Sequence, residues 1–324
     1  MEEKEIEDVE IGNILRPTSL KEYIGQEHMK TKLNIMLGSA KQRKSPLDHI
    51  LFSGPPGLGK TTISSLIAKE MNVNIISQAA PSIEKSGDLV SVLLNINEND
   101  IVFLDEIHRL PVHVEETLYS AMEDYKVDII TSIENGKEPI TLTLPKFTLI
   151  GATTRPGLLS APLRDRFGSH EQLQYYTTEE LAIIVKAASY KIGFNYISDM
   201  TCNIIGQRSR GTPRIALKIL KRLYDYSLHK NDPLTTEDSI QEALEVMTGM
   251  DKNGLNDSDR NYLRLVNEYG PIGLKNLSSM LSEDPQNIED YIEPYFMKNE
   301  LILKTSRGRK ITDKGMSVIN DIKY

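Results

Sequence analysis

A glycine-rich segment between an apolar run and a helical pattern constrains this chain more than any other feature. The segment reads Gly-Pro-Pro-Gly-Leu-Gly-Lys-Thr-Thr over residues 54–62 and follows a strand-like run at 49–52. Downstream, Ile63, Leu66 and Ile67 recur at helical spacing. This strand–loop–helix order predicts a phosphate-binding loop, because glycines let backbone N–H groups turn inward around an anion.

Two side chains of the loop suit a nucleotide with its metal ion. Lys60 supplies a point charge for the β- and γ-phosphates, and the Thr61 hydroxyl can ligate Mg²⁺. An ordinary glycine turn is the alternative, but every fixed position of the motif is present. We therefore expect ATP or ADP and Mg²⁺ as cofactors, with further nucleotide contacts from Gly57, Leu58, Gly59 and Thr62.

The composition indicates a soluble protein of several domains. The chain has 324 residues, more than one hydrophobic core commonly holds, so two or three domains are expected. No apolar run reaches the length of a membrane span, and the N-terminus is acidic. The single cysteine, Cys202, excludes an internal disulfide framework and is expected to be a small buried apolar side chain. We expect a cytoplasmic protein with no membrane partner.

The pattern along the chain predicts three domains. Short apolar runs alternate with helical patterns up to residue 178, which is typical of an α/β fold with a parallel sheet flanked by helices. Residues 179–250 carry helical patterns only, with helix caps expected at Thr178 and at Thr235-Thr236. A polar, glycine-containing break then opens a third unit at 251–324. Within the first domain, 1–178, we expect the acidic residues 1–13 to be disordered.

Two carboxylates follow the apolar run at 101–104. Ligands of open parallel sheets bind at the carboxyl ends of the strands, where this run would place Asp105 and Glu106. Asp105 would hold the water shell of Mg²⁺, and Glu106 would polarise the water that attacks the γ-phosphate. Two solvated acids are the alternative. His108 completes an Asp-Glu-Ile-His string similar to that of DExH helicases; we treat this as coincidence and expect His108 to begin a surface turn.

Hydroxyls and arginines add further candidates downstream. The run at 147–152 ends in Thr153 and Thr154, which could contact the γ-phosphate or merely bond to backbone at the strand end. Arginine suits phosphate oxygens because its planar guanidinium is always charged and binds two oxygens at once. The candidates are Arg164, Arg166, Arg210 and Arg214, and for Arg164 and Arg210 surface ion pairing remains an equal alternative.

Several strings, in order along the chain, resemble the RuvB family of AAA+ ATPases, the bacterial motors of Holliday junction branch migration. The resemblance runs from about Leu15 to Gly315. Besides the glycine-rich loop, it rests on Leu15-Arg-Pro17, Glu22-Tyr-Ile-Gly-Gln26, Asp48-His49, Asp105-Glu-Ile-His-Arg-Leu110, Gly151-Ala-Thr-Thr-Arg155, Pro162-Leu-Arg-Asp-Arg-Phe-Gly168, Arg210-Gly-Thr-Pro-Arg214 and Glu293-Pro-Tyr295.

The resemblance implies a role for each matching residue. The three domains become an AAA+ P-loop domain, an all-helical lid and a C-terminal winged-helix domain. Thr154 becomes the first sensor of the γ-phosphate, Arg214 the second sensor, and Arg166 a catalytic arginine finger that reaches a neighbouring subunit. Residues implied to border the nucleotide are Leu15, Arg16, Tyr23 and Ile24 on the adenine side and Tyr176 on the lid side.

The resemblance also implies partners. These are a homohexameric ring around duplex DNA, a RuvA-like junction-binding protein and, as a further candidate, a RuvC-like resolvase. Two strand-like runs at 127–144 flank an Asn-Gly turn, and we expect partly exposed apolar residues there to dock the RuvA-like protein rather than to belong to the core.

A locally basic hairpin in the third domain is the candidate DNA contact. A glycine turn presents four cations, which would hold phosphates without reading bases: Lys304, Arg307, Arg309 and Lys310. A solvated hairpin is the alternative. The family usually has arginine at the position of Lys304 and a different string at 77–81. Two other functions stay open, a nucleotide-switched loader or regulator that does not translocate and a protein-remodelling ATPase.

Overall fold

The computed structural model describes residues 14–133 and 136–320, so the acidic segment 1–13 lies outside the described residues. The chain forms two compact units. One comprises Arg16–Gln174, and the other comprises the chain from Tyr175 onward together with Leu15.

A five-stranded parallel sheet is the centre of the first unit, as the alternating pattern predicted. Its strand order is β2-β3-β6-β1-β7, with β1 between β6 and β7. The register pairs Ser53 with Thr153 and Leu104 with Gly151, so the carboxyl ends of three adjacent strands lie at one edge. The strands are β1 (Ile50–Ser53), β2 (Ile75–Ala79), β3 (Ile101–Asp105), β6 (Thr148–Thr153) and β7 (Ser169–Gln172).

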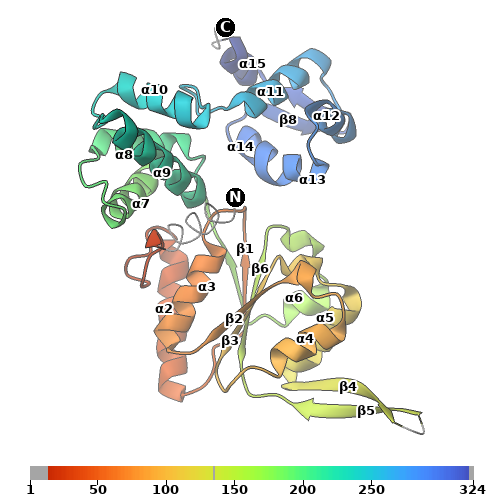
Figure 1. Ribbon diagram of the computed structural model, residues 1–324. Coiled ribbons are helices and arrows are strands. Elements are labelled where there is room, and N and C mark those ends of the chain that lie inside the picture. Colours follow the sequence, from red (N-terminus) through yellow and green to blue (C-terminus); the bar gives the residue numbers. More distant parts are fainter. Residues whose placement is uncertain (1–13, 134–135, 321–324) are drawn as a thin grey trace. The chain divides into compact units, whose positions relative to one another are not determined.

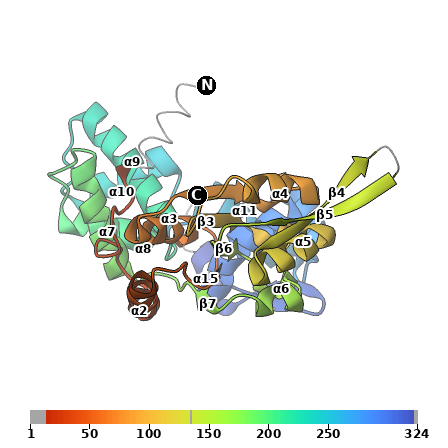
Figure 2. The ribbon, with the colours of Figure 1, turned by 90° about the horizontal axis from the view of Figure 1, so that it is seen from below.

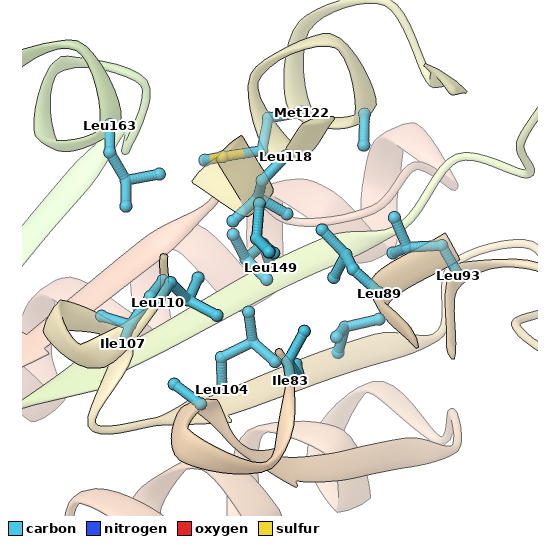
Figure 3. Close-up of a cluster of buried hydrophobic side chains, with 14 of the residues drawn as sticks. Ile83, Leu89, Leu93, Leu104, Ile107, Leu110, Leu118, Met122, Leu149 and Leu163 are labelled. Atoms are coloured by element: carbon cyan, nitrogen blue, oxygen red, sulfur yellow. The ribbon is translucent and has the colours of Figure 1, made fainter. Parts of the chain in front are cut away.

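Helices cover both faces of this sheet (Figure 1). On one face lie α2 (Glu27–Arg43) and α3 (Lys60–Met71), and on the other α4 (Ser86–Leu93), α5 (Val112–Glu123) and α6 (Ala161–Asp165). Figure 3 shows side chains of the second face meeting, with Leu104 and Leu149 from the strands and Leu89 and Leu118 from the helices. Three short 3₁₀ turns connect elements, η1 (Ala80–Ser82), η2 (Ile107–Arg109) and η3 (Pro156–Leu158).

The predicted hairpin forms and extends away from the sheet (Figures 1 and 2). Strand β4 (Lys126–Ile133) pairs antiparallel with β5 (Gly136–Thr143), while Asn135 of the turn lies outside the described residues. At the base of the hairpin Val127 is buried in the core, whereas Ile140 is 45% exposed. The base therefore anchors the hairpin, and Ile140 has the partial exposure expected of a docking surface.

The second unit begins with four helices, in agreement with the helical patterns predicted for the lid. Its first helix is capped one residue earlier than expected: Thr177, not Thr178, accepts from the backbone N–H of Glu180, whose carboxylate accepts from the N–H of Thr177. Thr236 caps the last helix, as predicted. The helices are α7 (Thr178–Lys191), α8 (Asp199–Arg208), α9 (Pro213–Lys230) and α10 (Glu237–Thr248).

The chain after residue 250 has its own core, which includes Tyr262, Leu277, Phe296 and Ile302. A two-stranded antiparallel hairpin, which we call the wing, packs there with β8 (Ile302–Thr305) against β9 (Gly308–Ile311). The helical elements are α11 (Asp257–Tyr269), α12 (Leu274–Leu281), α13 (Pro285–Asn287), η4 (Ile288–Ile292), α14 (Glu293–Lys298) and α15 (Asp313–Asn320). This arrangement agrees with the expected winged-helix domain.

Cys202 is buried in α8, and burial raises the pKa of its thiol to about 11. The residue is therefore the inert apolar side chain that the composition predicted. Of the helices in 14–133 and 136–320, none combines the length and apolar character needed to cross a membrane.

A buried ion pair joins the lid to the winged-helix domain. Arg210 bonds to both carboxylate oxygens of Asp259, and its side chain is 10% exposed against 3% for Asp259. The same guanidinium donates to the carbonyl of Gly254 at 3.2 Å and lies 4.8 Å from the ring centre of Tyr295. The structure supports ion pairing of Arg210, although the pair is buried and not at the surface as the alternative had it.

Removing one charge of this pair should destabilise the second unit. Asp259→Asn keeps the shape of the side chain but leaves Arg210 as an uncompensated buried cation, which costs about 3 kcal/mol of unfolding free energy. Urea unfolding followed by circular dichroism measures the loss. Asp257→Asn is the matched control, because Asp257 pairs with Arg260 at 95% side-chain exposure. Equal losses in the two variants would contradict a structural role for the Arg210 pair.

Candidate nucleotide-binding site

The glycine-rich loop has the backbone that phosphate binding requires. Gly54, Gly57 and Gly59 have φ angles of 137°, 82° and 101°, a region that favours glycine. Lys60 is the first residue of α3, and its Nζ donates to the carbonyls of Gly54 at 2.7 Å and Pro55 at 3.1 Å. The ammonium group therefore lies against the loop backbone, where the N-terminus of a helix also attracts anions.

Tyr23 contacts the backbone of the glycine-rich loop. Its side chain is buried, and its hydroxyl donates to the carbonyl of Leu58 at 3.4 Å. A Cβ atom on Gly59 would lie 2.8 Å from that hydroxyl. Of the other residues predicted to border the adenine, Ile24 is half-buried beside Tyr23 in the sequence and Arg16 is exposed.

The predicted acids stand at the same sheet edge as the loop. Asp105 ends β3, and its Oδ1 accepts from the backbone N–H of Glu106 at 3.0 Å. Glu106 has a φ of 50°, so the chain turns sharply as it leaves the strand. Strands β3 and β1 flank β6. Only one strand therefore separates the two acids at the end of β3 from the loop and Lys60 after β1.

Glu106 is held by the residues of two strand ends. Its Oε2 accepts from the backbone N–H of Thr154 at 3.1 Å and from the Thr154 hydroxyl at 2.9 Å, and lies 3.2 Å from Nδ1 of His108. The expectation of a surface turn at His108 is wrong for its side chain, which is 5% exposed and also 2.9 Å from the hydroxyl of Thr153. Thr153 in turn accepts from the N–H of Arg155, the strand-end role left open for it.

Arg166 is fixed in its own unit by α5. Its Nη2 bonds to Glu123 at 3.1 Å, its guanidinium lies 4.4 Å from the ring centre of Tyr119, and its side chain is 22% exposed. The neighbouring Arg164 is exposed, with its Nε 3.9 Å from Asp165, which agrees with the surface-pair interpretation.

Comparison with known proteins identifies the family of the chain. The model of the Holliday junction DNA helicase RuvB P-loop domain matches residues 15–173, the RuvB AAA lid domain 176–250, and the RuvB C-terminal winged helix domain 252–320. The chain belongs to the RuvB family. Members of this family are AAA+ ATPases of Holliday junction branch migration in recombination and repair, and the chain is one of them.

Individual relatives are similar over almost the whole chain. The Holliday junction branch migration complex subunit RuvB of Campylobacter hominis is 47% identical over 97% of this chain and 92% of its own length. The corresponding subunit of Ehrlichia ruminantium is 49% identical over 96% and 93%. The solved Holliday junction branch migration motor RuvB of Thermotoga maritima has a TM-score of 0.85 at 40% identity, covering 95% of this chain and 98% of that one.

Three residues that the RuvB resemblance assigned to the nucleotide belong to the second unit. Leu15 and Tyr176 are buried, and the N–H of Tyr176 donates to the carbonyl of Gly211 at 3.0 Å. Arg214 is exposed and follows Pro213, the first residue of α9, as the proline predicted. Their roles at the nucleotide remain predictions.

The four predicted DNA-contacting cations of the wing differ in exposure and in whether they pair with acids. Arg309 bonds to the fully buried Glu293 at 2.7 Å and to Glu289 at 2.8 Å, and its side chain is 11% exposed. Lys304 reaches the same Glu293 at 2.8 Å. Burial favours the protonated form of Glu293, but hydrogen bonds from Arg309 and Lys304 outweigh it and lower the pKa of this carboxyl. Arg309 therefore anchors the wing.

The remaining wing cations, Arg307 and Lys310, are exposed, and Lys304 keeps 39% of its side-chain exposure. The sequence pattern could not separate these groups, because the acids that pair with Arg309 lie on η4 and α14 rather than on the hairpin.

A methyl group at position 59 should disable the loop of this RuvB-family chain. Gly59→Ala adds a Cβ 2.8 Å from the Tyr23 hydroxyl at a φ of 101°, and strain of this kind lowers nucleotide affinity by at least about 10-fold. Titration with fluorescent ADP measures the affinity. Gly38→Ala, whose added carbon has no atom within 4 Å outside its chain neighbours and its own helix backbone, should bind as the unchanged protein does. Wild-type affinity in Gly59→Ala would contradict the assignment of the loop.

Proposed function

We propose that the chain works as a hexameric ring that uses ATP to move the arms of a Holliday junction, together with a RuvA-like partner. One observation supports this most strongly in a RuvB-family chain. Strands β1, β6 and β3 end at one sheet edge, where Asp105 is the last residue of β3 and where Glu106, Thr154 and Lys60 follow the ends of β3, β6 and β1.

The residues at this edge fit ATP with Mg²⁺. The loop glycines carry no side chain that could obstruct the amides of the loop, and they permit its positive φ angles. Lys60 supplies the charge for the phosphates. Thr61 and Asp105 offer oxygen ligands of the kind that Mg²⁺ prefers. When bound, Mg²⁺ neutralises charge on the β- and γ-phosphate oxygens. Glu106 orients the attacking water, and Thr154 contacts the γ-phosphate as the first sensor.

Arg166 completes the site of a neighbouring subunit in this proposal. The ring of Tyr119 and the carboxylate of Glu123 orient its guanidinium. The side chain therefore loses less conformational entropy when subunits assemble. An arginine supplied in trans accelerates hydrolysis by about 10³–10⁵-fold, so ATP is hydrolysed only between adjacent subunits. Arg214 senses the nucleotide of its own subunit, and Leu15, Arg16, Tyr23, Ile24 and Tyr176 border it.

A mixing experiment tests the shared site. Lys60→Ala cannot hold ATP but carries Arg166, and Arg166→Ala holds ATP but lacks the arginine, so each variant alone should lose at least about 10³-fold in DNA-stimulated ATPase rate. Mixing them should restore activity, because some interfaces then combine an intact loop with an intact Arg166. The rate of a synthetic four-way junction's branch migration, with the RuvA-like protein present, is measured in parallel.

Two results would contradict this mechanism. Wild-type hydrolysis by Arg166→Ala would show that the arginine is not needed, and a mixture no more active than its components would show that it acts in its own subunit. Arg164→Ala is the matched control, since Arg164 is an exposed arginine two residues away and should leave both rates unchanged. Hydrolysis without junction movement in the wild-type protein would favour the loader alternative.

The DNA and protein contacts of the proposal lie on the two hairpins. Arg307, Lys310 and Lys304 grip duplex phosphates from the wing, without base contacts, which suits a motor that must pass over any sequence. The hairpin β4–β5 docks the RuvA-like partner through its exposed apolar residues, including Ile140. A RuvC-like resolvase is a further proposed partner of the assembly, and the cytoplasm its proposed location.

The wing assignment predicts different effects for neighbouring cations. Arg307→Ala and Lys310→Ala should each weaken DNA binding and lower the slope of log affinity against log salt by about 1, because each releases one phosphate contact. Arg309→Ala should instead lower the unfolding midpoint, because it leaves Glu293 buried without its main partner. The affinity of each variant for fluorescent duplex DNA is measured at a series of salt concentrations. An unchanged slope in both Arg307→Ala and Lys310→Ala would contradict the assignment of these residues to DNA contact.

A further inference from the structure

We infer that His108 is a positioning residue for Glu106, holding the carboxylate in place while Thr154 contacts the γ-phosphate. The inference rests on the proposed function, in which Glu106 orients the attacking water. It assigns a role to a side chain outside the phosphate loop, the sensors and the arginine finger.

A sharp turn of the backbone places the side chain of His108 next to that of Glu106. Glu106 leaves β3 in a left-handed conformation, with a φ of 50°, and η2 begins at the next residue. Through this turn the side chains of residues 106 and 108 meet on the same side, with Nδ1 of His108 3.2 Å from Oε2 of Glu106. The imidazole is 5% exposed and the carboxylate 30%, so the imidazole forms the inner layer and the carboxylate faces outward.

The chemistry of the neighbours assigns the proton of the ring. An ionised carboxylate only accepts hydrogen bonds, so Nδ1 must carry a proton to bond Glu106. The second atom close to Nδ1, the hydroxyl oxygen of Thr153 at 2.9 Å, has lone pairs for that N–H and for the N–H of Arg155. With its proton on Nδ1, the imidazole has two acceptors within reach, the hydroxyl of Thr153 at 2.9 Å and the inner oxygen of Glu106 at 3.2 Å.

The need for a second donor follows from the single hydroxyl proton of Thr154. In the structure this hydroxyl donates to Oε2 of Glu106 at 2.9 Å. A hydroxyl has one proton, so Thr154 cannot donate to Glu106 and to a γ-phosphate at once. When Thr154 turns to the phosphate, the N–H of His108 and the backbone N–H of Thr154 still hold Oε2. The outer oxygen of the carboxylate then stays directed toward the water.

Three substitutions at position 108 test this role in the full-length protein. His108→Leu should lower kcat of DNA-stimulated ATP hydrolysis by about 10–100-fold while KM changes less than about 2-fold, because it affects the reacting step and not nucleotide binding. His108→Asn places an amide N–H close to the position of Nδ1 and should retain most of the rate. His108→Gln places it one carbon farther and should resemble His108→Leu.

Other variants separate this inference from the proposed function. Glu106→Gln should abolish hydrolysis, and adding His108→Leu should then change nothing more, since His108 acts through Glu106. Normal hydrolysis by Glu106→Gln would overturn the proposed role of Glu106 and the inference with it. An inactive Glu106→Gln beside a fully active His108→Leu would overturn the inference alone.

A purely structural role of His108 gives a different result. It would lower the unfolding midpoint and raise KM together with any change in kcat. If His108→Leu does not fold, the Asn and Gln variants decide, because both are polar and close to histidine in size; equal rates for the two would overturn the inference. His229→Leu, at an exposed histidine of α9, is the matched control and should behave as wild type.

Discussion

The parallel pairing of β1, β6 and β3 is the constraint on which the proposed nucleotide site depends. Ser53 pairs with Thr153, and Leu104 with Gly151, so three chain segments separated by long stretches of sequence end at one level. Parallel strands require crossovers, and here helices form them and bury both faces of the sheet. The edge where the strands end is left for polar groups, and Lys60, Asp105, Glu106 and Thr154 follow from it.

Charged side chains in this protein divide according to their partners. Arg309 is paired with two carboxylates, and Arg210 with one carboxylate and a backbone carbonyl; the side chains of both are little exposed. Arg166 has a single carboxylate and an aromatic ring, so its guanidinium is oriented yet partly exposed. Arginines with the same formal charge thus differ in how completely their neighbours enclose them, which net charge or local clustering cannot reveal.

The sequence predicted those features that depend on local pattern. The loop glycines, the buried strand before the acids, the lid helices and the hairpin all follow from periodicity or turn chemistry. Contacts between positions far apart in the sequence could not be predicted from such patterns. Arg309 finds its acid 16 residues away and Arg210 its acid 49 residues away. His108 was misjudged because the direction of its side chain depends on the left-handed backbone of Glu106, which no periodicity encodes.

The ion pair between Arg210 and Asp259 has a mechanical consequence. A buried, hydrogen-bonded pair resists sliding, because any displacement separates opposite charges in a medium that screens them poorly. Arg210 precedes the first turn of α9 by three residues, and Asp259 lies in the first turn of α11. The pair therefore ties the start of α9 in the lid to the start of α11 in the winged-helix domain, and a movement of one helix end against the other has to break it.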